Sequence, residues 1–317
     1  MACHLAARAT AAPEVTLWAR DAAQASAMAT ARRNERYLPA VALPPALRIT
    51  ADLAAASACD VLFAAVPVAA LPALLAALRT TERRAPLLSL AKGFVAADAG
   101  GGPLIHQRLA AQWSAPVGVI SGPSFAEEVA QGLPTALTVA ATVPDLASRV
   151  ASLLRGDTLR AYVTPDLVGV AVGGAIKNVL AIAAGASDGL RFGHNARAAL
   201  ITRGLAETGR LSTALGGQRE TLMGLAGLGD LVLTCTGNLS RNRRVGLALA
   251  EGRSLDHILA ELGHVAEGVP AAREVARRAA ELGIDMPITG AVTAVLDGRI
   301  TPVAAVEQLM ARDPKHE

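Results

Sequence analysis

The chain has 317 residues, 52% of them hydrophobic and 18% charged, which is typical of two folded domains and excludes intrinsic disorder. Its net charge of +3 comes from scattered Lys and Arg with no basic tract that contains aromatics, so the composition argues against a nucleic-acid-binding protein. Cys3, Cys59 and Cys235 lack CxxC spacing, which predicts neither a disulfide framework nor a zinc site and favours a reducing cytoplasm.

The first half of the chain alternates short strand-like runs with Ala-rich helical runs. We expect strands at 14–20, 59–66, 86–90, 117–121, 135–141 and 160–164, and helices at 21–33, 68–79, 105–113 and 144–155. This alternation is typical of a mostly parallel sheet with helices on its faces.

One run in this half, Val61–Leu78, is uncharged and long enough to span a bilayer. Pro67 and Pro72 interrupt the run, and no Lys/Arg clusters flank it closely. We interpret it as a buried strand that leads into a helix, with a membrane span as the alternative. The first fourteen residues contain Arg8 and no compact apolar core, so they do not predict a signal peptide.

After Thr164-Pro165 the hydrophobic period changes to that of helices. The helical segments are expected at 166–185, 196–215, 241–251, 254–262, 271–282 and 302–311, with no convincing strand among them. We therefore expect a doubly wound, Rossmann-type domain over residues 1–164 and an all-helical domain over residues 165–317.

A doubly wound domain normally binds a dinucleotide through a GxGxxG loop after its first strand. The chain contains no such loop, and Met1–Leu5 reads like the middle of the helix that should follow it. We expect the missing strand and loop, about fifteen residues, to be encoded upstream of Met1; the alternative is a protein that binds no dinucleotide. Arg20, at the end of the strand 14–20, suits the 2′-phosphate of NADP or is an ordinary exposed Arg.

Two polar motifs follow predicted strands of the first half. Lys92, in Ser89–Gly93 (SLAKG), lies at the strand edge where α/β sheets place ligands, although a lone Lys is more often solvated. Gly122 and Ser124 lie in the next strand-exit loop, Ile120–Ala126, where Gly permits close backbone approach and Ser offers a hydroxyl. A simple turn, with Ser124 capping the next helix, is the alternative.

Lys177 lies in an apolar helical stretch that includes Gly173–Asn178 (GGAIKN). A buried Lys is costly unless it is paired or functional, and burial or a neighbouring cation lowers its pKa towards the range used in acid–base catalysis. Asp230, in the Gly-rich segment Gly227–Leu231, would orient the ammonium and hold it charged if it lies beside Lys177. Taken alone, Asp230 is also consistent with a helix cap or a turn residue.

Ser240, Arg241 and Asn242 follow a turn and open a predicted helix. A Ser at the N-cap, exposed backbone N–H groups and a bidentate Arg together suit a phosphate. The alternative is a capped surface helix with its Arg in solvent.

Taken in order, these segments resemble the bacterial NAD(P)-dependent glycerol-3-phosphate dehydrogenases, as do Leu17–Arg20 (LWAR) near the start and Val265–Gly268 (VAEG) near the end. The resemblance covers residues 2 to about 312. It implies a cytoplasmic enzyme that reduces dihydroxyacetone phosphate to sn-glycerol 3-phosphate for glycerophospholipid synthesis, using NAD or NADP, with NADPH favoured for reduction. A catalytically impaired form, or a related two-domain hydroxy acid dehydrogenase, is the alternative.

The resemblance also implies roles for individual residues. Lys177 is the expected catalytic proton donor and acceptor. The expected substrate contacts are Lys92, Gly122, Ser124, Lys177, Asp230, Ser240, Arg241 and Asn242. The expected cofactor contacts are Arg20, Tyr37, Lys92, Ala126, Arg241, Val265 and Glu267. No metal, nucleic acid or stable membrane insertion is expected, the partner is a small phosphorylated substrate, and a homodimer is left open.

Overall fold

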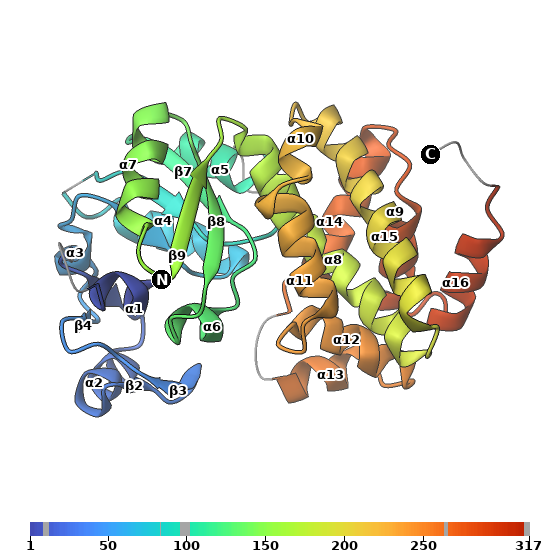
Figure 1. The fold of residues 1–317 in the computed structure, drawn as a ribbon, viewed down its shortest axis with the longest axis horizontal. Coiled ribbons are helices and arrows are strands. Elements are labelled where there is room, and N and C mark those ends of the chain that lie inside the picture. Colours follow the sequence, from blue (N-terminus) through green and yellow to red (C-terminus); the bar gives the residue numbers. More distant parts are fainter. Residues whose placement is uncertain (9–12, 83, 96–101, 263–265, 314–317) are drawn as a thin grey trace.

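A computed structural model describes residues 1–8, 13–82, 84–95, 102–262 and 266–313. The N-terminal part contains the strands and the C-terminal part is helical, and the two parts lie side by side (Figure 1). This is the Rossmann-type domain followed by a helical domain that the sequence predicts. The last strand ends at Val163 and the first long helix begins at Leu167, on either side of the expected boundary.

The main sheet has five strands in the order β5-β6-β7-β8-β9, parallel except where β7 pairs with β8. A separate parallel pair joins β1 to β4, and an antiparallel hairpin joins β2 to β3. The bounds are β1 (Thr16–Trp18), β2 (Arg33–Asn34), β3 (Leu38–Ala42), β4 (Arg48–Thr50), β5 (Leu62–Ala64), β6 (Leu87–Ser89), β7 (Val117–Ser121), β8 (Thr135–Ala141) and β9 (Leu159–Val163).

The helices of the N-terminal part include the four expected ones and two short helices that the sequence analysis missed, α3 and α6. They are α1 (Ala2–Ala6), α2 (Ala22–Ala31), α3 (Leu53–Ser57), the 3-10 turn η1 (Val68–Ala70), α4 (Leu71–Leu78), α5 (Ile105–Gln112), α6 (Ala126–Ala130) and α7 (Pro144–Leu154). The run Val61–Leu78 is the expected strand and helix, because it divides into β5, η1 and α4. It is not a single membrane span.

The C-terminal part contains the expected helices and three that the sequence analysis missed, α10, α11 and α15. Its elements are α8 (Leu167–Gly189), α9 (Gly193–Ala214), α10 (Arg219–Leu222), the π-helical turn η3 (Leu225–Gly229), α11 (Asp230–Thr236), α12 (Arg241–Ala250), α13 (Leu255–Leu262), α14 (Gly268–Glu281), α15 (Pro287–Leu296) and α16 (Pro302–Met310). Among the described residues after 165 no strand is present, as expected.

Helix α8 is the central element of the helical part. Asp166 caps it, because its Oδ1 accepts a hydrogen bond from the Gly169 N–H at 2.8 Å while its Oδ2 accepts one from the Gln218 N–H at 2.9 Å. The helix is long and apolar enough to cross a membrane, but 78% of its most apolar window is buried inside the fold. We therefore regard α8 as a core helix around which the other helices pack.

Two glycines allow α8 and α12 to cross in direct backbone contact. A Cβ built on Gly185 of α8 would collide with the carbonyl oxygen of Arg243, and one built on Gly246 of α12 would collide with that of Ile182. The close crossing brings the start of α12 beside the middle of α8. It thereby sets where Asn242 lies relative to Asn178.

Replacing Gly246 by Ala is expected to lower the free energy of unfolding by about 1–3 kcal/mol, because the added methyl group meets backbone that cannot rotate away. Urea unfolding followed by circular dichroism measures the change. Gly290 on α15 is the matched control: its Cβ would meet open space, so Gly290→Ala should stabilise by up to about 1 kcal/mol through helix propensity. Equal effects of the two substitutions would contradict the close crossing.

Candidate active site

Two lysines meet on one buried carboxylate where the two parts of the chain join. Lys92 follows β6, Lys177 lies in the middle of α8 and Asp230 is the first residue of α11. Lys177 Nζ is 2.5 Å from Asp230 Oδ1, and Lys92 Nζ is 2.6 Å from Asp230 Oδ2. The structure thus brings together three of the predicted site residues from positions 138 residues apart along the chain.

Small residues allow Asp230 to approach Lys177. A Cβ on Gly173, one turn before Lys177 in α8, would lie 2.6 Å from the carbonyl oxygen of Ala226 in η3. Gly227 in the same turn is equally tight, because its Cβ would collide with the backbone of Leu222. The Gly-rich segment before Asp230 is therefore a wide helical turn pressed against α8, and it delivers the carboxylate to the lysines.

Burial and charge set the protonation of this cluster. Burial, followed by the charge of Lys92, lowers the pKa of Lys177 to about 8, against the opposing effect of Asp230. Burial alone would raise the pKa of Asp230, but Lys92 and Lys177 outweigh it and hold that pKa below its usual value. With both lysines protonated, the cluster carries one excess positive charge, which suits an anionic substrate or a developing oxyanion.

The loop after β7 closes one side of the cluster. Lys92 Nζ also donates to the carbonyl oxygen of Gly122 at 3.0 Å, and Ser124 Oγ donates to the same oxygen at 2.9 Å. Gly122 has a φ of 139°, and a Cβ there would lie 3.0 Å from the carbonyl oxygen of Ala136, so the position favours glycine. The alternative that Ser124 caps the next helix is wrong, because Phe125 is the N-cap of α6 and makes no side-chain cap.

The residues expected to hold the phosphate lie at the start of α12. Ser240 is buried and caps the helix, with its Oγ accepting from the Arg243 N–H at 3.2 Å. Arg241 is exposed, whereas Asn242 is buried. Asn242 Nδ2 donates to Asn178 Oδ1 at 2.9 Å, and Asn178 Nδ2 donates to the carbonyl oxygen of Lys92 at 3.1 Å. This end of α12 is thereby connected to the lysine cluster.

One expected cofactor residue bridges the two parts of the chain. Glu267 precedes α14, and its Oε1 accepts a hydrogen bond at 2.9 Å from the N–H of Val68, just beyond β5. Burial raises the pKa of Glu267, which its hydrogen bond from Val68 and nearby cations oppose. Val265, also expected to contact the cofactor, lies outside the described residues.

The other expected cofactor residues lie on the N-terminal part. Arg20 follows β1 and is exposed, and Ala126 is the exposed first residue of α6. Tyr37 is 43% exposed on the β2–β3 hairpin, with the guanidinium carbon of Arg36 5.1 Å from its ring centre. In Figure 1 this hairpin lies at the lower edge of the N-terminal part, apart from α8 and α11.

Two of the expected cofactor residues lie where parallel strands end. Arg20 follows β1, which pairs with β4, and Lys92 follows β6 of the main sheet. Sheets of this class place ligands at the carboxyl ends of their strands, so both positions are compatible with a dinucleotide. No sequence in the chain matches the glycine loop that would hold its pyrophosphate.

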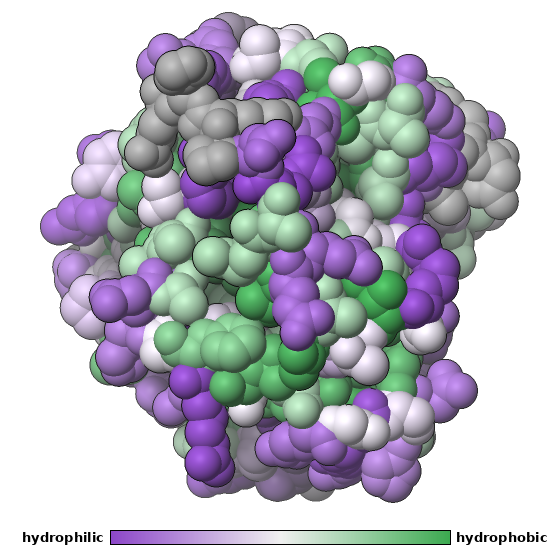
Figure 2. Space-filling view, turned by 90° about the vertical axis from the view of Figure 1, so that its right-hand side faces the viewer, coloured by the Kyte–Doolittle hydropathy of each residue, from purple (hydrophilic) through white to green (hydrophobic). Residues whose placement is uncertain are grey.

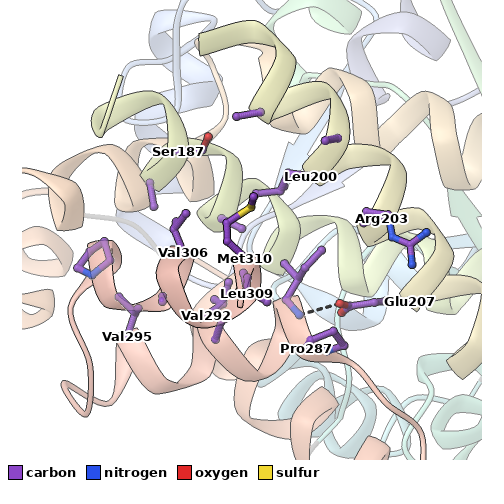
Figure 3. A pocket seen from close by; sticks show the side chains of 18 of the residues that line it. Ser187, Leu200, Arg203, Glu207, Pro287, Val292, Val295, Val306, Leu309 and Met310 are labelled. Atoms are coloured by element: carbon purple, nitrogen blue, oxygen red, sulfur yellow. Dashed lines mark hydrogen bonds between the residues drawn. The ribbon is translucent and has the colours of Figure 1, made fainter. Parts of the chain in front are cut away.

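A sizeable cavity in the described part of the protein lies elsewhere. It has a volume of about 480 Å³ and is enclosed mainly by α8, α9, α15 and α16. Leu200, Val306 and Leu309 are among its apolar side chains (Figure 3), and Figure 2 shows apolar surface across this face of the helical part. None of the predicted site residues lines it. We assign the chemistry to the lysine cluster because charged groups converge there.

The sequence analysis missed three polar side chains that complete the cluster. Ser121 Oγ is 3.3 Å from Asp230 Oδ2, Thr234 Oγ1 is 3.5 Å from Asp230 Oδ1, and Asn178 contacts Lys92. A polar residue within the apolar stretch of α8 is a signal that marks Asn178. The rarity of lysine is another such signal: Lys92, Lys177 and Lys315 are the only lysines among the 30 Lys and Arg, and two of them meet at Asp230.

Comparison with known proteins identifies the family. The family descriptions "NAD-dependent glycerol-3-phosphate dehydrogenase N-terminus" and "C-terminus" match residues 1–147 and 166–307. The chain is 55% identical to the glycerol-3-phosphate dehydrogenase [NAD(P)+] of Aromatoleum aromaticum, over 96% of this chain and 93% of that one. It is 54% identical to that of Dechloromonas aromatica, over 96% and 92%. The crystal structure of glycerol-3-phosphate dehydrogenase from Coxiella burnetii superimposes with a TM-score of 0.91 at 39% identity, covering 98% of this chain and 95% of the other. The chain therefore belongs to the family of NAD(P)-dependent glycerol-3-phosphate dehydrogenases.

Proposed function

We propose that the protein interconverts dihydroxyacetone phosphate and sn-glycerol 3-phosphate with NAD or NADP, and that Lys177 is its proton donor and acceptor. The observation that carries the assignment of Lys177 is the convergence of Lys177 and Lys92 on buried Asp230. An assay of NADPH oxidation with dihydroxyacetone phosphate, compared with unphosphorylated ketones, tests the proposal. Turnover of the ketones alone would favour a hydroxy acid dehydrogenase, the alternative drawn from the sequence.

The reaction requires a hydride at the carbonyl carbon and a proton at its oxygen. When bound, the nicotinamide supplies or accepts the hydride. Lys177 donates a proton to the oxygen in its ammonium form and takes the proton back as a neutral amine in the reverse direction. Its pKa of about 8 makes both forms accessible near neutral pH, as a general acid–base group requires.

Lys92 and Asp230 prepare this proton transfer. The ammonium of Lys92 polarises the substrate carbonyl and stabilises negative charge as it develops on the oxygen. Asp230 keeps both lysines at the same place, and its low pKa keeps it ionised through the reaction. The loop of Gly122 and Ser124 restrains Lys92 from its other side.

The start of α12 is the proposed phosphate site. The capped helix terminus and the exposed Arg241 provide donors and positive charge for a dianion. Glu267, Arg20, Ala126, Tyr37 and Val265 remain proposed cofactor contacts, together with Lys92 and Arg241. The charge of Arg241 is one of the smaller effects that oppose the raised pKa of Glu267, which is consistent with proposed phosphate and cofactor residues that lie near one another.

Replacing Arg241 by Ala is expected to raise KM for dihydroxyacetone phosphate by about 10–100-fold with a smaller change in kcat, because a charge-assisted hydrogen bond contributes about 1.5–3 kcal/mol. Steady-state kinetics over a range of substrate concentrations measures this. Arg299→Ala is the matched control, because Arg299 is exposed, pairs with its near neighbour Asp297 and is not one of the predicted site residues. An unaltered KM in Arg241→Ala would remove Arg241 from the phosphate site.

Several finer assignments are part of the proposal. The family uses NAD or NADP, and the preference between them is open. A role in glycerophospholipid synthesis in the cytoplasm fits the family and the buried Cys3 and Cys235, which form no disulfide. A homodimer is tested by the mass of the protein in solution.

A further inference from the structure

Three hydrogen bonds form a continuous series across the junction of the two parts of the chain. The Gly268 N–H donates to Asn242 Oδ1 at 3.0 Å, Asn242 Nδ2 donates to Asn178 Oδ1 at 2.9 Å, and Asn178 Nδ2 donates to the carbonyl oxygen of Lys92 at 3.1 Å. Asn178 and Asn242 are both buried. We call Asn178 and Asn242 the amide pair.

The chemistry of the series suits amides at both positions. Each side chain of the amide pair accepts one hydrogen bond through its oxygen and donates one through its nitrogen, which a carboxylate, a hydrocarbon or an ammonium group cannot do at once. The packing around the pair is also tight, because a Cβ on Gly268 would lie 2.8 Å from Asn242 Oδ1 and 2.6 Å from the carbonyl oxygen of Asn178. The pair is therefore held in one orientation.

Both ends of the series are backbone groups, the carbonyl of Lys92 and the N–H of Gly268. Asn178 holds the carbonyl of Lys92 in the loop after β6, while Lys92 Nζ reaches Asp230 from the same residue. At the other end, Gly268 is next to Glu267, which holds the N–H of Val68 in the loop after β5. Two neighbouring strand-exit loops are thus both fastened to the helical part.

We propose that Asn178 is a positioning residue of the dehydrogenase: with Asn242, it holds the backbone of Lys92 against α8 so that both lysines stay on Asp230. This inference rests on the proposed roles of Lys92 and Lys177. Asn242, an expected substrate contact, would then have a second role. Through Asn178 it links the start of α12, the proposed phosphate site, to Lys92, the residue that polarises the carbonyl. Asn178 acts through Lys92.

The small number of lysines permits a direct test without substrate or cofactor. Protein labelled with ¹³Cε-lysine carries three labelled side chains, because the sequence contains three lysines. Lys92→Met and Lys177→Met assign the signals, and a pH titration reports the pKa of Lys177. In Asn178→Ala we expect this pKa to rise by about 0.5–1, because Lys92 leaves Asp230 and no longer disfavours the charge on Lys177. Asn242→Ala should produce a smaller rise.

A double-mutant cycle separates positioning from a simple loosening of the core. In Lys92→Met the pKa of Lys177 is already raised, and adding Asn178→Ala should leave it unchanged if Asn178 acts through Lys92. A further rise as large as that in the wild-type background would mean that water reaches Lys177 directly, and would overturn the proposal. No rise in either single amide variant would also overturn it.

Kinetics and a matched control complete the design. Asn178→Ala should lower kcat about tenfold in the wild-type background and much less in Lys92→Met. Thr293→Val is the control, because Thr293 is buried in the helical part and also donates to a main-chain carbonyl, that of Ala272 at 3.2 Å. It should lower stability without moving the pKa of Lys177. An unchanged pKa of Lys177 in Asn178→Ala would overturn the positioning role of Asn178 without affecting the proposed dehydrogenase activity, so the two proposals are tested independently.

Discussion

Replacing Lys177 by Met is expected to lower kcat for the reduction of dihydroxyacetone phosphate by about 10²–10⁴-fold, because the variant has no group to protonate the substrate oxygen. Met has a similar length and tolerates a buried site, and Asp230 keeps its ion pair with Lys92. The fold should therefore persist, with a KM close to that of the wild type. Steady-state kinetics at saturating NADPH measures both constants.

The outcome is read against two controls. Thermal unfolding establishes that the variant is folded, and Lys92→Met separates the proton donor from the residue that polarises the carbonyl. Both lysines bind the same carboxylate, so a general loss of charge at the cluster would affect both variants equally. A kcat that stays within a few-fold of wild type in Lys177→Met would exclude Lys177 as the proton donor.

Replacing Asp230 by Asn should destabilise the protein by about 3–5 kcal/mol at pH 6.5, because the buried ammonium of Lys177 and the partly buried ammonium of Lys92 lose their shared counter-charge. Without Asp230, the pKa of Lys177 falls further below about 8, and the unfolded state then binds more protons than the folded one. Stability should therefore rise with pH, and the deficit relative to wild type should shrink by pH 9 as Lys177 loses its proton. Urea unfolding at both pH values measures the change.

Asp188 provides the matched control for this prediction. Its carboxylate also holds two cations in the helical part, Arg197 at 3.0 Å and Arg243 at 2.6 Å. Arginine does not lose its proton in this pH range, so the stability lost in Asp188→Asn should not recover at pH 9. The same pH dependence in both variants would show that the recovery does not come from Lys177.

Much of the fold could be predicted from the sequence because its hydrophobic periods are clear. The β-branched runs became strands and the period-3.6 segments became helices, and even the apolar run Val61–Leu78 divided at its prolines as expected. Short elements without a period of their own were missed, such as the β2–β3 hairpin and α11. Helix α15 was missed because its sequence is apolar on nearly every side and has no distinct stripe.

The site could be predicted in part. The burial of Lys177 and its need for a partner follow from its apolar helical surroundings and from the cost of an isolated charge there, and the structure shows the buried Lys177 paired with Asp230, which the sequence offered as one possible role for that residue. The contacts of Asn178 depend on the close crossing of α8 and α12, which joins residues 64 positions apart and leaves no local pattern. The substrate and cofactor roles themselves came from family resemblance, and they stay predictions.

The separation of the β1–β4 pair from the main sheet has a consequence for cooperativity. Within the described residues no ladder of backbone hydrogen bonds joins the two, so the segment 13–50 is held mainly by side chains such as Met28, Leu43 and Leu47 packed against α1. Such a segment opens at a lower free energy than a shared sheet does. Arg20 and Tyr37 lie in this segment, so amide exchange there should slow when a nucleotide binds and ties it to the rest of the fold. The adenosine end of the proposed cofactor site would then be the last part of the molecule to become rigid.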